Sequence, residues 1–153
     1  MTTDQSQKLS SLRVSGKQTS GMRTDVRARQ FNLVIDEPES LGGTDEGANP
    51  MEYVLAGLAG CASVMLRMIA KEQDLEYESV SLDIRGTLDL RGLEGVPGVS
   101  RHFQTVTGKV EVVTSDADKL QKVAEAIEDR CPAYNLLKDA GVDIAFDWVA
   151  VSK

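Results

Sequence analysis

The segment Asn49–Cys61, which reads NPMEYVLAGLAGC, decides the fold that we predict for this chain. Asn49 is a good N-cap, and Pro50 suits the first helical position, where the N–H that proline lacks would have no partner. No further proline interrupts residues 51–73. We therefore predict a helix over these residues, about 35 Å long at roughly 1.5 Å per residue.

The first two-thirds of this helix is apolar on nearly every side, because Glu52 is its only charged residue before Arg67. A helix that is apolar all round must be buried all round. In a chain of 153 residues, we expect this burial at a subunit interface. The helix also offers a flat surface of small residues for a second backbone: Ala56, Gly57, Ala59, Gly60, Ala62 and Ser63. Each glycine costs the helix about 1 kcal/mol, which interface packing should offset.

Sequence patterns on either side of this helix predict an α+β domain. Residues 1–8 are expected to form a disordered tail, and residues 9–36 two or three antiparallel strands with turns at Gly16 and at Ser20-Gly21. Residues 37–48 are rich in Pro, Gly, Ser and acidic residues, which indicates a loop. The chain shows no internal repeat, so residues 9–153 are predicted to form a single domain.

After the helix, apolar residues alternate over 80–90 and again over 103–112, which predicts two strands joined by a glycine-rich loop at 91–100. Ser115–Asp118 resembles a capping box that opens a helix ending near Arg130. Cys131-Pro132 breaks this helix, and residues 133–140 form a short helix that ends at Gly141. Residues 142–148 alternate again and predict a closing strand.

Composition and charge exclude several classes of function. The formal net charge of −7 argues against a nucleic-acid partner, which is normally met by a basic surface, and against an anionic membrane. The first seven residues are polar and resemble no secretory signal. The longest apolar stretch, residues 53–66, is short for a bilayer span, so we expect a cytoplasmic protein. Two cysteines with one solvated histidine, His102, predict neither a metal site nor a resident cofactor.

The two cysteines are either inert buried thiols or a redox pair, because structural disulfides are rare in the cytosol. Cys61 has small neighbours, Gly60 and Ala62, that leave its sulfur accessible, and nothing beside it in sequence would lower its pKa. Cys131 is predicted to cap the short helix, whose N-terminus would stabilise a thiolate. Local sequence alone therefore favours Cys131 as the more acidic thiol.

Two motifs change the balance between these alternatives. The segment 49–61 resembles the cysteine-bearing helix of the OsmC/Ohr family, osmotically inducible and organic hydroperoxide resistance proteins. The segment 130–137, RCPAYNLL, resembles the family's second motif, and the lead-ins Asp36–Pro38 and Leu41–Thr44 are also similar. The resemblance extends over residues 20–151 and indicates a divergent OsmC-like branch.

The resemblance implies an OsmC-like fold, with antiparallel sheets around a long central helix, in an intertwined homodimer with active sites at the subunit interface. It implies that Cys61 is the peroxidatic residue, which an organic hydroperoxide oxidises to a sulfenic acid, and that Cys131 resolves it as a disulfide. An external dithiol such as lipoamide would then restore both thiols. Local sequence favoured Cys131 as the more acidic thiol, but the resemblance assigns the attack on the peroxide to Cys61, and we adopt that assignment.

The resemblance also implies an Arg–Glu pair that activates the thiolate. Glu52 is the candidate carboxylate, although the family's glutamate directly follows the proline, where this chain has Met51. Glu52 lies about half a turn from Cys61 around an ideal helix, so it also fits a first-turn acid that favours the helix dipole. The arginine candidates lie on the N-terminal strands: Arg23, Arg27 and Arg29, of which Arg29 and Arg23 best match two branches of the family.

Two other functions remain open at this stage. The chain could be a non-enzymatic dimer that senses redox state or binds a small apolar ligand, an alternative favoured by Met51 at the glutamate position. It could also be an acyl or thiol transferase that uses Cys61 as its nucleophile.

Overall fold

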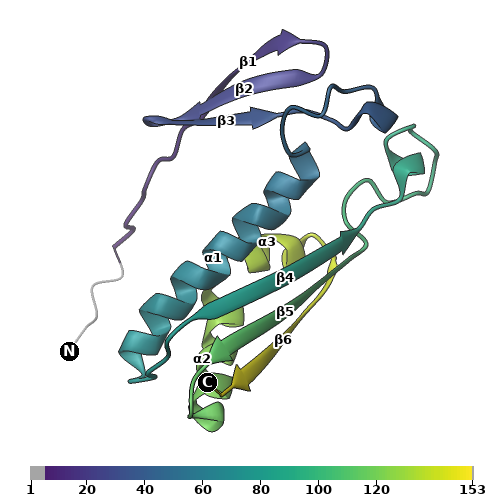
Figure 1. Cartoon of the computed structure of the whole chain (residues 1–153). Coiled ribbons are helices and arrows are strands. Elements are labelled where there is room, and N and C mark those ends of the chain that lie inside the picture. Colours follow the sequence, from purple (N-terminus) through teal and green to yellow (C-terminus); the bar gives the residue numbers. More distant parts are fainter. Residues whose placement is uncertain (1–5, 153) are drawn as a thin grey trace. The chain divides into compact units, whose positions relative to one another are not determined.

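The computed structural model describes residues 6–152, and the chain divides into two compact units at Tyr53/Val54, each described by itself below. Residues 1–5 of the predicted disordered tail lie outside the described residues. The single-domain boundary at residue 9 stays a prediction. Figure 1 shows the course of the chain through three strands, a long helix, two strands, two helices and a last strand.

The first unit contains an antiparallel sheet of β1 (Ser15–Ser20), β2 (Arg23–Ala28) and β3 (Phe31–Ile35), in that order. This confirms the predicted antiparallel strands and the turn at Gly21. The predicted turn at Gly16 is wrong, because Gly16 pairs with Val26 inside β1. The second turn lies instead at residues 29–30, where Arg29 has a φ of 56°.

One buried carboxylate organises the connection between β3 and the long helix. Asp36 is 1% exposed and accepts hydrogen bonds from the backbone N–H of Glu37, Thr44 and Glu46 and from the Thr44 hydroxyl, at 2.7 to 3.2 Å. The hydroxyl bond from Thr44, aided by the backbone donors, lowers the pKa of Asp36. The loop that we predicted over 37–48 is therefore ordered, and it includes one turn of 3₁₀ helix, η1 (Glu39–Leu41).

Helix α1 (Pro50–Glu72) begins and ends within one residue of the prediction. A reciprocal capping box starts it: the Asn49 N–H donates to Glu52 Oε2, and the Glu52 N–H donates to Asn49 Oδ1, both at 2.8 Å. By length and composition alone α1 could cross a membrane, so the short apolar stretch does not exclude a span, contrary to the prediction. Its buried residues nevertheless recur at the spacing of one helix face, as in a core helix: Leu58, Ala62, Met65, Leu66, Ile69 and Ala70.

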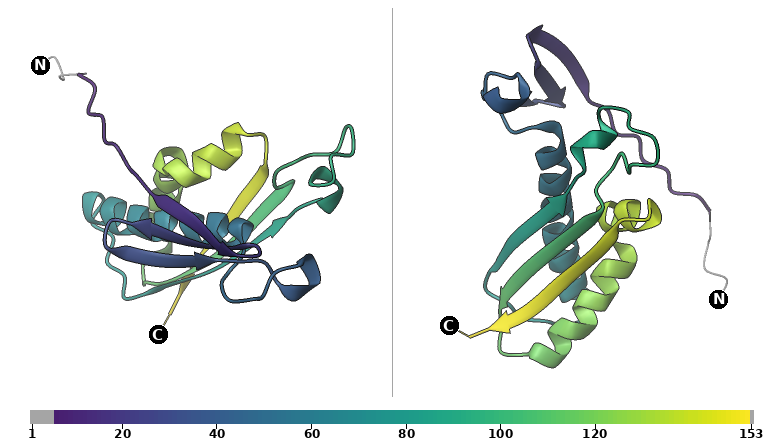
Figure 2. Two further views of the ribbon diagram at one scale, coloured as in Figure 1. Left: turned by 90° about the horizontal axis from the view of Figure 1, so that it is seen from above. Right: turned by 90° about the vertical axis from the view of Figure 1, so that its right-hand side faces the viewer.

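The second unit holds a mixed sheet of β4 (Val80–Thr87), β5 (Thr105–Val113) and β6 (Asp143–Val151). Strand β4 is antiparallel to β5, as predicted, but the prediction of antiparallel sheets is wrong for β6, which runs parallel to β5. A parallel neighbour requires a crossover, which α2 (Ala117–Arg130) and α3 (Pro132–Asp139) supply. Figure 2 shows the three strands side by side, and both helices contact β6.

The end of β4 differs from the prediction, which extended this strand to Leu90. The strand stops at Thr87, and Leu90 opens a turn of 3₁₀ helix, η2 (Leu90–Gly92), where its side chain is 49% exposed. Asp89 causes the change, because its carboxylate accepts from the Arg91 N–H and pairs with the Arg91 guanidinium. An Asx-type cap of this kind offers the backbone an alternative to the sheet ladder.

The covered face of this sheet is closely packed around two strand glycines. Val106, Val110 and Val112 of β5 are fully buried, and they alternate with the polar residues Thr107, Lys109 and Glu111. The Phe103 ring lies over Gly86, and the Phe146 ring lies over Gly108. A Cβ on Gly108 would lie 2.6 Å from Phe146 Cδ1. Glycine is required here because the aromatic ring occupies the space of a side chain.

We predict that Gly108→Ala destabilises the protein by about 1–3 kcal/mol, because the Phe146 ring must leave its position to admit the methyl group. Urea unfolding followed by circular dichroism measures the change. The control is the same substitution in a Phe146→Leu background, where the ring is absent and the cost should shrink. An equal cost in both backgrounds would show that the ring does not exclude the methyl group.

Candidate active site

The two cysteines of the chain meet in the second unit, although seventy residues separate them. Cys61 lies in the middle of α1 and Cys131 between α2 and α3, and their Sγ atoms are 3.0 Å apart. Both are free thiols. Cys131 is fully buried, whereas Cys61 is partly exposed. A sulfur pair at this separation can close to a disulfide with a small movement, since the bond itself is about 2.05 Å long.

Proline fixes the position of Cys131 at the junction of two helices. Pro132 has no N–H to continue α2, so α2 ends at Arg130 and Pro132 becomes the first residue of α3. Cys131 has extended backbone, with φ −72° and ψ 116°, and occupies both the C-cap of α2 and the N-cap of α3. The predicted N-cap position is confirmed.

The prediction that Cys131 is the more acidic thiol is wrong. Burial, together with the sulfur of Cys61, raises the pKa of Cys131 to about 11. The backbone N–H groups of Tyr134 and Ala133, at the start of α3, act in the opposite direction but do not offset burial. Local sequence showed the helix N-terminus, but it could not show that packing buries the Cys131 side chain completely.

Two polar contacts that sequence analysis missed hold this junction. The Asn135 side-chain N–H₂ group lies 2.9 to 3.1 Å from the carbonyl oxygens of Glu128, Asp129 and Cys131, which are at the end of α2. The Arg130 guanidinium forms a bidentate pair with Glu72, at 2.6 and 3.1 Å, and ties the end of α2 to the end of α1. An asparagine four residues after a helix-breaking Cys-Pro was the one available signal, since it can reach back to orphan carbonyls.

Aromatic side chains connect α3, the helix that follows Cys131, to β6. Tyr134 is buried and meets the Phe146 ring edge-on, with 5.4 Å between ring centroids. Trp148 Nε1 donates to Glu128 Oε1 at 3.2 Å, and the Tyr134 hydroxyl also interacts with this carboxylate. Burial, then the charge of Glu128, raises the pKa of Tyr134. These contacts fix α3 on the sheet and with it the position of Cys131.

Comparison with known proteins shows that the segment containing both cysteines matches a protein family. The family model described as OsmC-like protein matches residues 43–147, which include both cysteines. The chain belongs to the OsmC-like protein family. Organic hydroperoxide resistance protein OhrB of Bacillus subtilis (strain 168) is 28% identical over 132 residues, covering 86% of this chain and 90% of that protein.

Solved structures of OsmC-like proteins share the fold. An organic hydroperoxide resistance protein OsmC from Legionella pneumophila superposes with a TM-score of 0.73 at 21% identity, covering 95% of this chain and 100% of that one. OhrB of Bacillus subtilis gives a TM-score of 0.65 at 22% identity, with 93% and 100% covered. The OsmC-like α+β fold predicted from the two motifs is confirmed.

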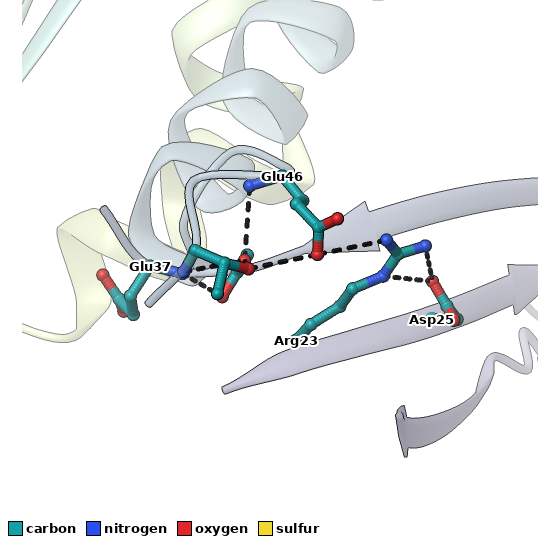
Figure 3. A network of polar contacts seen from close by, with 6 residues as sticks. Arg23, Asp25, Glu37 and Glu46 are labelled. Carbon is teal, nitrogen blue, oxygen red and sulfur yellow. Dashed lines mark hydrogen bonds and ion pairs between the residues drawn. The ribbon is translucent and has the colours of Figure 1, made fainter. Parts of the chain in front are cut away.

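The candidate arginines of this OsmC-like chain belong to the first unit and have different partners. Arg23 pairs with Asp25 at 3.0 Å and with Glu46 at 3.2 Å, as Figure 3 shows. The hydrogen bond to Asp25 and then that to Glu46 raise the pKa of Arg23. Arg29 is not on a strand, contrary to the prediction: it lies in the turn after β2, 5.0 Å above the Phe31 ring. Arg27 Nε donates to the Arg29 carbonyl oxygen at 2.8 Å.

Glu52 lies in the first turn of α1, and its carboxylate accepts the Asn49 N–H in the capping box. This contact is the one expected of a first-turn acid. The pairing of Glu52, Arg23 or Arg29 with Cys61 stays a prediction. Within residues 6–152, no group of three or more His, Cys, Asp and Glu side chains is placed to hold a metal ion.

We predict that iodoacetamide at pH 7 labels Cys61 much faster than Cys131. Alkylation requires the thiolate, and a pKa of about 11 leaves on the order of one Cys131 in ten thousand ionised at pH 7. Peptide mapping by mass spectrometry measures the two labelling rates. Both cysteines should react at similar rates in urea, and equal labelling in the native protein would contradict the assignment.

Proposed function

We propose that this OsmC-like protein is a thiol-dependent peroxidase that reduces organic hydroperoxides, with Cys61 as the attacking residue and Cys131 as the resolving one. The observation that carries the proposal is the 3.0 Å separation of the two sulfur atoms, at the two cysteines that match the family's motifs. The 28% identity with an organic hydroperoxide resistance protein, over 86% of the chain, supports peroxide detoxification as the broader role.

The chemistry would proceed in two steps. The Cys61 thiolate attacks the terminal oxygen of ROOH, so that an S–O bond forms, the O–O bond breaks, and the alkoxide leaves and takes a proton from water as ROH. The Cys131 sulfur then attacks the Cys61 sulfenic acid, so that an S–S bond forms and the S–O bond breaks. The hydroxide that leaves takes the Cys131 proton and departs as water. Sulfur is oxidised by two electrons in all, and the peroxide is reduced by two.

A dithiol must return these electrons, and we propose an external carrier such as lipoamide, with no resident cofactor. The dithiol attacks the Cys61–Cys131 disulfide, forms a mixed disulfide and closes on itself, which releases two protein thiols. Such a cycle needs a compartment that keeps dithiols reduced, which is consistent with a soluble cytoplasmic protein that has neither nucleic acid nor membrane as partner. In this proposal the Arg–Glu pair, from Arg23 or Arg29 with Glu52, supports the Cys61 thiolate.

We also propose that the protein acts as a homodimer. In the second unit α1 presents an exposed apolar face, with Val54, Val64 and Met68 between 40% and 59% exposed. Gly57 and Gly60 lie between them, and a Cβ on either would meet no atom within 4 Å. Such a face of small and apolar side chains is suited to a second copy of the same helix.

We predict that Val64→Glu dissociates the dimer, because it places a charge in the centre of this apolar face. Sedimentation or light scattering measures the molar mass. Gln121→Glu, which adds the same charge to an exposed position of α2, is the matched control and should stay dimeric. A wild-type protein that is monomeric, or a Val64→Glu variant that stays dimeric, would contradict this assembly.

We predict that one equivalent of cumene hydroperoxide removes both free thiols and lowers the mass of the chain by two hydrogen atoms. Free-thiol titration and intact mass spectrometry measure this, and hydrogen peroxide should react more slowly. Cys131→Ser should instead leave Cys61 oxidised without a disulfide, since it has no resolving sulfur.

The same experiment separates the alternatives. A disulfide that forms without turnover in the presence of a dithiol would indicate a redox sensor. Thiols that persist through peroxide treatment would favour a protein that binds a small apolar ligand. A thioester trapped on Cys61 would indicate acyl transfer.

A further inference from the structure

In the reduced protein, before any peroxide is present, the Cys131 thiol is already in contact with the sulfur of Cys61, the proposed attacking residue. The Cys131 Sγ donates to the Cys61 Sγ across 3.0 Å. The direction of this bond follows from burial. Cys131 is fully buried, and burial raises its pKa to about 11, so it keeps its proton at neutral pH and is the donor, whereas Cys61 is the partly exposed partner.

The surroundings of Cys131 leave its proton available for this bond. The backbone N–H groups of Tyr134 and Ala133, in the first turn of α3, lower the pKa of Cys131 but do not offset its burial, so the thiol keeps its proton. The thiol is then free to donate, and among the described residues the Cys61 sulfur is its acceptor.

Other polar groups near the cysteines in sequence have different partners. Position 51 holds methionine, and Glu52 completes the capping box with Asn49. Arg130, directly beside Cys131 in the chain, is paired with Glu72 by two hydrogen bonds. Within the second unit, the Cys131 thiol is therefore the hydrogen-bond donor that the described residues offer to the Cys61 sulfur.

We propose that the Cys131 thiol stabilises the Cys61 thiolate by an S–H···S⁻ hydrogen bond, so that Cys131 activates the attacking sulfur before it resolves the oxidised one. A hydrogen bond to the charged form of a group favours that form. The inference rests on the proposed function only in naming Cys61 as the attacking residue, since the hydrogen bond belongs to the reduced protein.

One proton would then serve two steps of the reaction. It lies between the sulfur atoms while Cys61 is a thiolate. After the peroxide has oxidised Cys61, the same proton leaves Cys131 with the hydroxide of the sulfenic acid, as water, while the S–S bond forms. No separate base is needed for Cys131, which explains how a thiol with so high a pKa can resolve at neutral pH.

The test compares three substitutions that separate the two roles of Cys131. Cys131→Ser keeps a hydroxyl donor but cannot form a disulfide, Cys131→Ala removes the donor, and Cys131→Val removes the donor but fills the space. The measurement is the rate of Cys61 alkylation by iodoacetamide between pH 5 and 10, without peroxide, which gives the Cys61 pKa. Circular dichroism confirms that each variant is folded.

We expect Cys131→Ala and Cys131→Val to raise the Cys61 pKa by about one unit, which slows alkylation about tenfold at pH values below that pKa. Cys131→Ser should stay within about twofold of the wild type, since a hydroxyl also donates. The proposal is overturned if all three variants alkylate at the wild-type rate, or if the serine variant is as slow as the alanine variant. Because no peroxide is present, absence of peroxidase activity in the wild type would contradict the proposed function and leave this result unaffected.

Discussion

The contact between Cys61 and Cys131 depends on one backbone constraint, the inability of Pro132 to continue α2. Because the chain must leave helical geometry at this point, Cys131 takes extended backbone and directs its sulfur towards α1. The junction would be loose if its carbonyl groups had no partners, but Asn135 bonds three of them and Arg130 pairs with Glu72. Because Pro132 lacks a backbone N–H and cannot continue α2, the chain turns at Cys131 and the two thiols lie 3.0 Å apart.

Burial then gives two chemically identical side chains different properties. Cys131 lies in the interior, where the thiolate loses its hydration, and its pKa rises to about 11 despite two favourable N–H groups. Cys61 keeps part of its surface exposed on a helix rich in glycine and alanine. The protein therefore has an accessible sulfur and a protonated sulfur in contact, an arrangement that suits sequential attack and resolution and that neither cysteine could provide by itself.

Local sequence predicted the elements whose causes are local. The Asn49-Pro50 cap and the absence of later prolines located α1 within one residue, and Cys131-Pro132 located the break between α2 and α3. Predictions failed where a side chain competed with the backbone or where burial mattered. Asp89 capped η2 and ended β4 early, and the positive φ of Arg29 removed this residue from a strand. The acidity assigned to Cys131 failed because desolvation depends on tertiary packing around the sulfur, which no local pattern contains.

Met51, which stands where the family resemblance implies a glutamate, bears on how the proposed Cys61 thiolate is stabilised. A carboxylate near a thiolate is useful only when it orients a cation, since by itself it would repel the negative sulfur. Glu52 is held by the N-cap of α1, and Arg23 is held between two acids, so both already contribute to structure. The hydrogen bond that we propose from the neutral Cys131 thiol needs no such compensation, because it favours a Cys61 thiolate without adding a second charge beside it. In this proposal, a chain with methionine at position 51 retains a means of favouring the thiolate, provided that Cys131 stays buried and protonated.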